Sequence, residues 1–124
     1  MRPIIAMVPL LLLSSCFSPP KRDCSEFKTG TFTFEALIGT EIETTTFVRN
    51  DSLEIDYFRG KADTSSIRWI NDCEYIVKKV HPKNMAEKKA IHMRILSTDK
   101  NSYTFEYGIV GEANKQKGTA VKVK

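Results

Sequence analysis

The sequence predicts an all-β domain, a small antiparallel meander of about eight strands that forms a barrel or a strongly curved sheet. From Cys24 onward, apolar and polar residues alternate with a period of two, which is typical of strands with one buried face. Gly, Asn and Asp, which favour tight turns, separate these alternating runs. The connections are also too short for parallel crossovers, which need about a dozen residues or more.

The first element, residues 1–15, has the pattern of a signal peptide. Arg2 supplies a positive charge, and an apolar run over residues 4–13 is interrupted only by Pro9. At about 1.5 Å per residue, this run is too short to cross the roughly 30 Å hydrocarbon core of a bilayer. A secretory signal that is removed from the mature protein is therefore the better interpretation.

The end of that run, Leu13-Ser14-Ser15-Cys16, resembles the bacterial lipobox. In that class of signals, signal peptidase II cuts before the cysteine, which carries a diacylglycerol anchor and usually an N-terminal acyl chain such as palmitate. The resemblance implies lipidation at Cys16 and a lipoprotein of the bacterial cell envelope, attached to the inner or outer membrane on its periplasmic side or at the surface. The alternative is an ordinary secreted protein that is cut nearby.

Residues 16–23 follow as a tether between the lipidated cysteine and a single β domain over residues 24–124. Pro19 and Pro20 favour an extended polyproline conformation, so this segment is expected to act as a short, semi-rigid spacer. Lys21 and Arg22 either contact anionic lipid headgroups or are simply solvated.

The two remaining cysteines, Cys24 and Cys73, are predicted to form a disulfide, because an exported protein folds in an oxidising compartment. Closing a loop of this length is worth about 4 kcal/mol. The alternative is a catalytic or metal-binding thiol. That interpretation is disfavoured because the chain contains only two histidines to serve as base or ligand.

Eight segments of the domain have strand character, either by alternation or by their content of β-branched and aromatic residues. They are residues 30–35, 41–48, 53–57, 65–70, 75–80, 91–95, 103–107 and 119–123. Residues 84–90 break the pattern and are expected to form one short helix or a loop, with Asn84 and Glu87 placed as in a capping box. The candidate core residues are Phe32, Phe34, Trp69, Phe105 and Tyr107.

The sequence contains no recognisable catalytic or metal-binding motif, and no cofactor is expected. His81 and His92 are predicted to lie at the surface, and their spacing fits no zinc site. Two carboxylate pairs, Glu41 with Glu43 and Glu54 with Asp56, each share one strand face. Such pairs can perform acid–base chemistry or bind calcium, but the solvated face of a strand is the preferred interpretation.

The distribution of charge is uneven along the chain. Residues 16–75 contain 7 Lys or Arg and 11 Asp or Glu, whereas residues 76–124 contain 11 and 4. The preferred interpretation is that the two halves interleave in space and largely neutralise each other, and the alternative is a basic surface for an anionic partner. Nucleic acid is not expected as a partner, because the predicted compartment holds none.

Several segments together are similar to a family of small bacterial lipoproteins of unknown function. They are residues 24–32, 44–51, 67–69, 72–75 and 117–120. Some members of that family carry the label "DNA topoisomerase IV". We do not transfer this activity, because such an enzyme needs an ATP-binding domain, an acidic metal cluster and a nucleophilic tyrosine on a DNA gate. One small exported domain cannot supply these parts.

Three functions are compatible with this sequence, and none of them is catalytic in the chain itself. The leading expectation is an envelope module that is anchored to the membrane through Cys16 and binds a protein or polymer of the envelope. The second is a lipocalin-like carrier of a small ligand, which requires a hollow barrel. The third is an inhibitor of a lytic enzyme, which the positive charge of the chain disfavours against basic lysozymes.

Overall fold

The computed structural model describes residue 3 and residues 22–124, and its fold is a closed barrel of eight antiparallel strands in meander order. The strands are β1 (Gly30–Ile38), β2 (Glu41–Arg49), β3 (Leu53–Phe58), β4 (Lys61–Asn71), β5 (Glu74–Lys79), β6 (Ile91–Thr98), β7 (Ser102–Ile109) and β8 (Gln116–Lys122). A short 3-10 helix, η1 (Cys24–Phe27), precedes them. The predicted all-β meander of about eight strands is confirmed.

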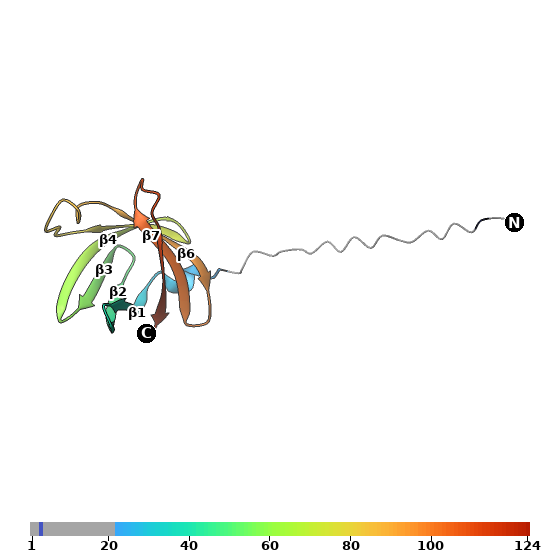
Figure 1. The fold of residues 1–124 in the computed structure, drawn as a ribbon, viewed down its shortest axis with the longest axis horizontal. Coiled ribbons are helices and arrows are strands. Elements are labelled where there is room, and N and C mark those ends of the chain that lie inside the picture. Colours follow the sequence, from blue (N-terminus) through green and yellow to red (C-terminus); the bar gives the residue numbers. More distant parts are fainter. Residues whose placement is uncertain (1–2, 4–21) are drawn as a thin grey trace.

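Closure of the barrel depends on the pairing of its first and last strands. Phe32 to Phe34 of β1 pair with Ala120 to Lys122 of β8, so the C-terminus lies beside β1 (Figure 1). Within residues 22–124 each strand therefore has a neighbour on both sides, which leaves unpaired strand edges, the kind that promote aggregation, only where the pairing is partial, as in the outer half of the β1–β2 hairpin. The predictions for the signal peptide, for Cys16 and for the tether fall outside the described residues, apart from residues 3, 22 and 23.

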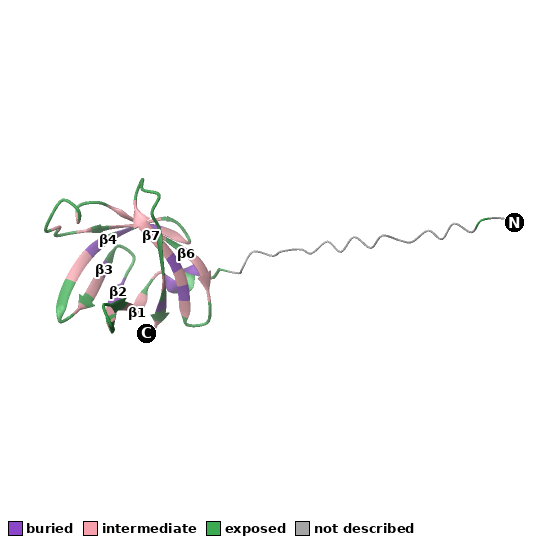
Figure 2. Ribbon diagram, viewed as in Figure 1, coloured by how far each residue is buried: buried purple, intermediate pink, exposed green. Residues whose placement is uncertain are grey.

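The connections between strands alternate between the two ends of the barrel, because consecutive strands run in opposite directions. One end, which we call the mouth, carries the connections 39–40, 59–60, 80–90 and 110–115. The other end, which we call the closed end, carries the connections 50–52, 72–73 and 99–101 together with η1. The buried segments form bands across the strands, and the connections are largely exposed (Figure 2).

Helix η1 covers the closed end of the barrel. Phe27 is buried and its ring lies 5.2 Å from that of Tyr103, while Cys24 forms a disulfide with Cys73 in the β4–β5 connection. The Lys122 ammonium donates a hydrogen bond to the Glu26 carbonyl at 2.6 Å. The predicted disulfide is confirmed, and it fixes η1 against the end of the sheet.

The core occupies the closed half of the barrel. Phe32 and Phe105 are buried, and Phe34, Trp69 and Tyr107 pack against them, as the sequence predicts. Gly118 of β8 permits this packing, because a Cβ there would lie 2.6 Å from Phe34 Cε2 and 2.8 Å from Phe105 Cζ.

Residues 84–90 form a loop with a single turn and no helix. One of the two contacts of a capping box is present, since the Asn84 side chain accepts a hydrogen bond from the Glu87 backbone N–H at 2.9 Å, whereas the Glu87 carboxylate accepts one at 3.2 Å from the side chain of Asn84 and not from its backbone N–H. The turn ends after the hydrogen bond from Lys89 N–H to the Ala86 carbonyl, because the chain must re-enter the sheet at Ile91.

Replacing both Cys24 and Cys73 by Ser is expected to lower the free energy of unfolding by about 4 kcal/mol, because the disulfide closes a long loop in the unfolded chain. Urea unfolding followed by circular dichroism measures this change. Adding a reducing agent to the wild-type protein should reproduce it. A loss below about 1 kcal/mol would show that η1 is held by its other contacts alone.

Candidate functional site

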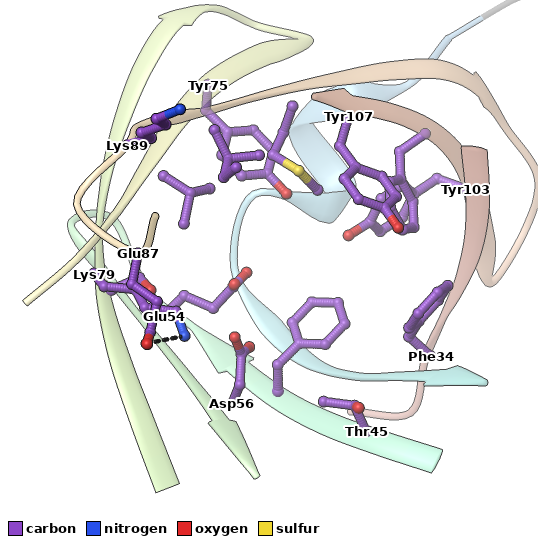
Figure 3. A pocket seen from close by; sticks show the side chains of 16 residues that line it. Phe34, Thr45, Glu54, Asp56, Tyr75, Lys79, Glu87, Lys89, Tyr103 and Tyr107 are labelled. Carbon is purple, nitrogen blue, oxygen red and sulfur yellow. Dashed lines mark hydrogen bonds and ion pairs between the residues drawn. The ribbon is translucent and has the colours of Figure 1, made fainter. Parts of the chain in front are cut away.

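A cavity of about 330 Å³ lies inside the barrel between the core and the mouth, and side chains from several strands point into it (Figure 3). Its volume is at the lower end of the range of about 300–1,000 Å³ that is usual for small-molecule sites. An eight-stranded barrel is wide enough either to be filled by side chains or to hold one small ligand. This barrel does both, because its closed half is filled and its mouth half is hollow.

One wall of the cavity is apolar. It is formed by side chains from β1, β5, β6 and β7, namely Phe34, Val77, Ile91, Met93, Phe105 and Tyr107. The Phe34 and Phe105 rings lie 5.7 Å apart, and the Phe105 and Tyr107 rings are separated by the same distance. This wall offers aromatic and aliphatic surface to the apolar part of a ligand.

The facing wall is polar and comes from β2, β3 and β4. Glu54 and Asp56 extend from β3 into the cavity (Figure 3). Ser65 of β4 lies directly opposite Glu54 in the strand register, and β2 adds Thr45 together with one apolar side chain, Phe47. Glu54 and Ser65 are both buried. The cavity is therefore amphipathic, with carboxyl groups on one side and rings on the other.

At the floor of the cavity, the side chain of Arg49, which is 1% exposed, forms hydrogen bonds with groups from several elements. Its Nη1 donates to Glu54 Oε1 at 3.1 Å and to the Tyr75 hydroxyl at 2.6 Å. Its Nη2 donates to the Phe27 carbonyl at 2.7 Å and to the Tyr103 hydroxyl at 3.1 Å. Together with the bond from Nε to the Lys28 carbonyl, each of the five N–H donors has a partner.

Burial raises the pKa of both floor tyrosines above the ordinary value, so Tyr75 and Tyr103 keep their protons. Their hydroxyls accept hydrogen bonds from Arg49 as neutral groups, and Glu54 is the carboxylate that balances the guanidinium charge. The nearby Trp69 indole N–H is buried and has no acceptor among residues 22–124, and nothing in the structure explains this.

The carboxyl group of Asp56 is less well compensated than that of Glu54. Burial raises its pKa to about 8, with further contributions from the charge of Glu54, from a hydrogen bond to Glu54 and from the charge of Asp63, while Lys79 opposes the shift. Asp56 therefore carries its proton at neutral pH. A carboxyl group with a perturbed pKa in a cavity is a recognised mark of a functional site.

The 80–90 loop is held over the mouth by ion pairs. The Lys79 ammonium lies 2.8 Å from Asp63 and 2.9 Å from Glu87, and the latter pair is drawn in Figure 3. Lys89, which also lines the cavity, lies 3.8 Å from Glu112 of the β7–β8 connection. The mouth is thus bordered by cations that already have carboxylate partners.

The structure corrects the predicted position of one carboxylate pair. Glu54 and Asp56 were expected on the solvated face of their strand, but they line the cavity, while Leu53 and Tyr57 are 39% and 46% exposed. Alternation alone does not say which face is inside. The strand register indicates which face is inside. The short turn between β2 and β3 places Arg49 opposite Glu54, and these two opposite charges form a buried ion pair.

The other predicted sites lie apart from the cavity. Glu41 is exposed, and Glu43 pairs with Arg59 at the mouth. His81 is exposed, whereas His92 is half-buried on the outside of β6, with its Nε2 3.5 Å from Glu74. Within residues 22–124 there is no group of three or more His, Cys, Asp and Glu side chains arranged to hold a metal ion.

The acidic and basic parts of the chain meet at strand β5. Glu74, from the acidic part, lies 3.5 Å from His92 and 3.8 Å from Arg94 of the basic part, and Asp63 pairs with Lys79. The two parts therefore neutralise each other at least along this strand.

The fold and the cavity together define a small meander β-barrel with a ligand-sized interior. A scan against protein-family models found no match for the chain, and searches of the curated proteins and of the solved structures found none either. Among the described residues, no helix has the length and apolar character needed to cross a membrane.

The stability of the protein is expected to fall as the pH rises from about 4 to about 8. Over this range the folded state retains the Asp56 proton, whereas the unfolded state, with the ordinary pKa of 3.8, has released it. The slope contributed by one proton is at most about 1.4 kcal/mol per pH unit.

Urea unfolding of the wild-type protein and of the Asp56→Asn variant at several pH values tests this expectation. All other groups are the same in both proteins, so the difference between the two curves isolates Asp56. We expect the Asp56→Asn substitution to remove the downward slope and to stabilise the protein at pH 7. Two parallel curves would show that Asp56 ionises normally.

Proposed function

We propose that the protein binds one small, largely apolar ligand inside its barrel, as a lipocalin-like carrier does. The observation that carries this proposal is the cavity of about 330 Å³, which is walled by Phe34, Phe105 and other apolar side chains. A barrel that served only as a rigid scaffold would be more stable with this space filled, because unfilled apolar volume loses packing energy.

The proposed role is binding without catalysis. Of the two carboxyl groups in the cavity, Glu54 is engaged by Arg49 at 3.1 Å and serves as the counter-ion of a buried charge. Asp56 holds a proton at neutral pH, and the cavity wall, as far as the structure describes it, offers no cysteine or histidine as a nucleophile or base beside it.

A second role, as an envelope module that binds a protein or polymer, is supported by the β1–β2 hairpin. Its outer half pairs only within itself, because β3 pairs with β2 from Thr46 onward and β8 pairs with β1 only at residues 32–34. Leu37 and Ile42, which face each other across this hairpin, are 71% and 70% exposed. Exposed apolar side chains on a projecting hairpin suit contact with a partner surface.

We further propose that the protein is a lipoprotein of the bacterial cell envelope, anchored through Cys16, in keeping with its resemblance to small bacterial lipoproteins. The lipobox at residues 13–16 supports this proposal. Two or three acyl chains hold a protein on a membrane, whereas a single chain binds only marginally.

Ligand binding is tested with N-phenyl-1-naphthylamine, a neutral apolar dye whose fluorescence rises in an apolar site. We expect saturable binding to the wild-type protein. Val77→Phe, which fills the cavity from β5, should weaken binding roughly tenfold or more, or about 1.4 kcal/mol.

The matched control for this test is Val48→Phe, the same substitution on the exposed outer face of β2. This variant should bind the dye like the wild-type protein. Circular dichroism establishes that both variants are folded. Absence of binding by the wild-type protein, or equal binding by the two variants, would contradict the proposal.

Lipidation is tested by growing cells with an alkyne-labelled palmitate. The wild-type protein and its Cys24→Ser variant should incorporate the label and enter the detergent phase on phase separation, whereas Cys16→Ser should do neither. Label retained by Cys16→Ser would place the acyl chains elsewhere and disprove the anchor.

A further inference from the structure

The polar groups of the cavity are concentrated on one wall, at strands β3 and β4. Glu54 pairs across the ladder with Ser65, and Asp56 pairs with Asp63. The opposite wall carries Phe34, Met93 and Phe105. A ligand that fills this space must therefore present a polar group to β3 and β4 and an apolar group to the rest of the cavity.

The hydroxyl group of Ser65, on this wall, lacks a hydrogen-bond partner in the described part of the protein. The residue is 3% exposed and lines the cavity, and no side-chain hydrogen bond of its hydroxyl is found within residues 22–124; the oxygen is not fully enclosed by protein and is open to the cavity. Most buried hydroxyl groups in proteins have a partner, because leaving one unpaired is unfavourable. A ligand group placed between Ser65 and the carboxyl groups would supply that partner.

The charges on this wall indicate the chemical nature of the ligand group that would lie beside Ser65. Arg49 neutralises Glu54, and Lys79 is shared between Asp63 and Glu87. Asp56 has no basic partner within 4 Å among the described residues and is kept neutral by its proton. A cation beside Asp56 can replace this proton, and the buried wall remains balanced.

The same balance disfavours an anionic ligand at this wall. A carboxylate or phosphate would lie beside two acidic side chains. Both lysines that line the cavity are already engaged, since Lys79 is held between Asp63 and Glu87 and Lys89 pairs with Glu112. Like charges in a buried site repel strongly, because the surroundings screen them poorly. A neutral ligand would leave Asp56 protonated and would gain nothing from its ionisation.

We propose that the ligand is a small amphiphile with one protonated amino group, which lies against Asp56, Glu54 and Ser65 while its apolar part packs on Phe34 and Phe105. This inference rests on the proposed function, since it names the class of ligand for the same cavity. The amino group donates hydrogen bonds to the Asp56 carboxylate and the Ser65 hydroxyl, and the Asp56 proton is released to solvent on binding.

The test compares three probes that share one alkyl chain, n-octylamine, n-octanol and octanoate, as competitors of N-phenyl-1-naphthylamine. We expect n-octylamine to bind roughly tenfold or more tightly than either of the others, which corresponds to about 1.4 kcal/mol. Titration calorimetry at pH 7 in two buffers of different ionisation enthalpy should also show release of about one proton for the amine only.

The Asp56→Asn variant should lose both the preference for the amine and the release of a proton, and circular dichroism establishes that it is folded. The matched control is Asp51→Asn, the same substitution in the exposed β2–β3 turn, which should keep both.

The two proposals fail in different ways. If the wild-type protein binds the dye but shows no preference for the amine, or if Asp56→Asn keeps the preference, the inference about the ligand class is overturned and the cavity remains a binding site. If no probe and no dye binds, the proposed function is overturned together with it.

Discussion

The buried guanidinium of Arg49 is the interaction on which the rest of the structure depends. Its five hydrogen bonds connect β2 to β3, β5, β7 and η1, so one side chain links four strands and the helix that covers them. An isolated charge would be unstable in this place, because removal from water costs several kcal/mol. Here every N–H has an acceptor, and the rings of Phe32 and Tyr75 lie 4.8 and 4.9 Å from the guanidinium carbon.

The cavity takes its character from this network. Arg49 holds the hydroxyls of Tyr75 and Tyr103 at the floor and turns Glu54 toward itself, so the space above them stays open. One buried cation stands beside two carboxyl groups of the cavity, the buried Glu54 and the half-buried Asp56, and it forms an ion pair with Glu54 only. Asp56, the second carboxyl group, stays uncharged by keeping its proton. The cavity is acidic because Glu54 is neutralised by Arg49 whereas Asp56 is not neutralised by any cation among residues 22–124.

Most of the fold could be predicted from the sequence, because strand alternation and turn residues are local signals. The eight strands follow from the alternation of neighbouring residues. The disulfide follows from the number of cysteines, because only Cys24 and Cys73 remain once Cys16 is assigned to the lipid anchor. The closed form of the barrel depends on the pairing of β1 with β8, which are far apart in the sequence and leave no local trace.

The cavity was harder to predict because its residues violate the usual rule that carboxylates face solvent. In β3 the polar side of the alternation is the inside, and the compensating charge, Arg49, comes from the neighbouring strand. The short helix η1 was missed as well, since its four residues show no helical periodicity and it is held by a disulfide and by contacts with distant residues. Both features depend on tertiary contacts that override local patterns.

The chain enters the barrel at the end opposite to its opening. Arg22 donates a hydrogen bond to the Ile95 carbonyl at 3.1 Å, and the Asp23 backbone N–H donates one to Thr98 Oγ1 at 2.8 Å, both next to η1. The described domain therefore begins at its closed end, and its opening lies at the far end of the barrel from Arg22. Exchange with the interior consequently takes place at the end of the molecule where the N-terminal segment does not emerge, so whatever is joined to that segment does not obstruct the opening from the closed end.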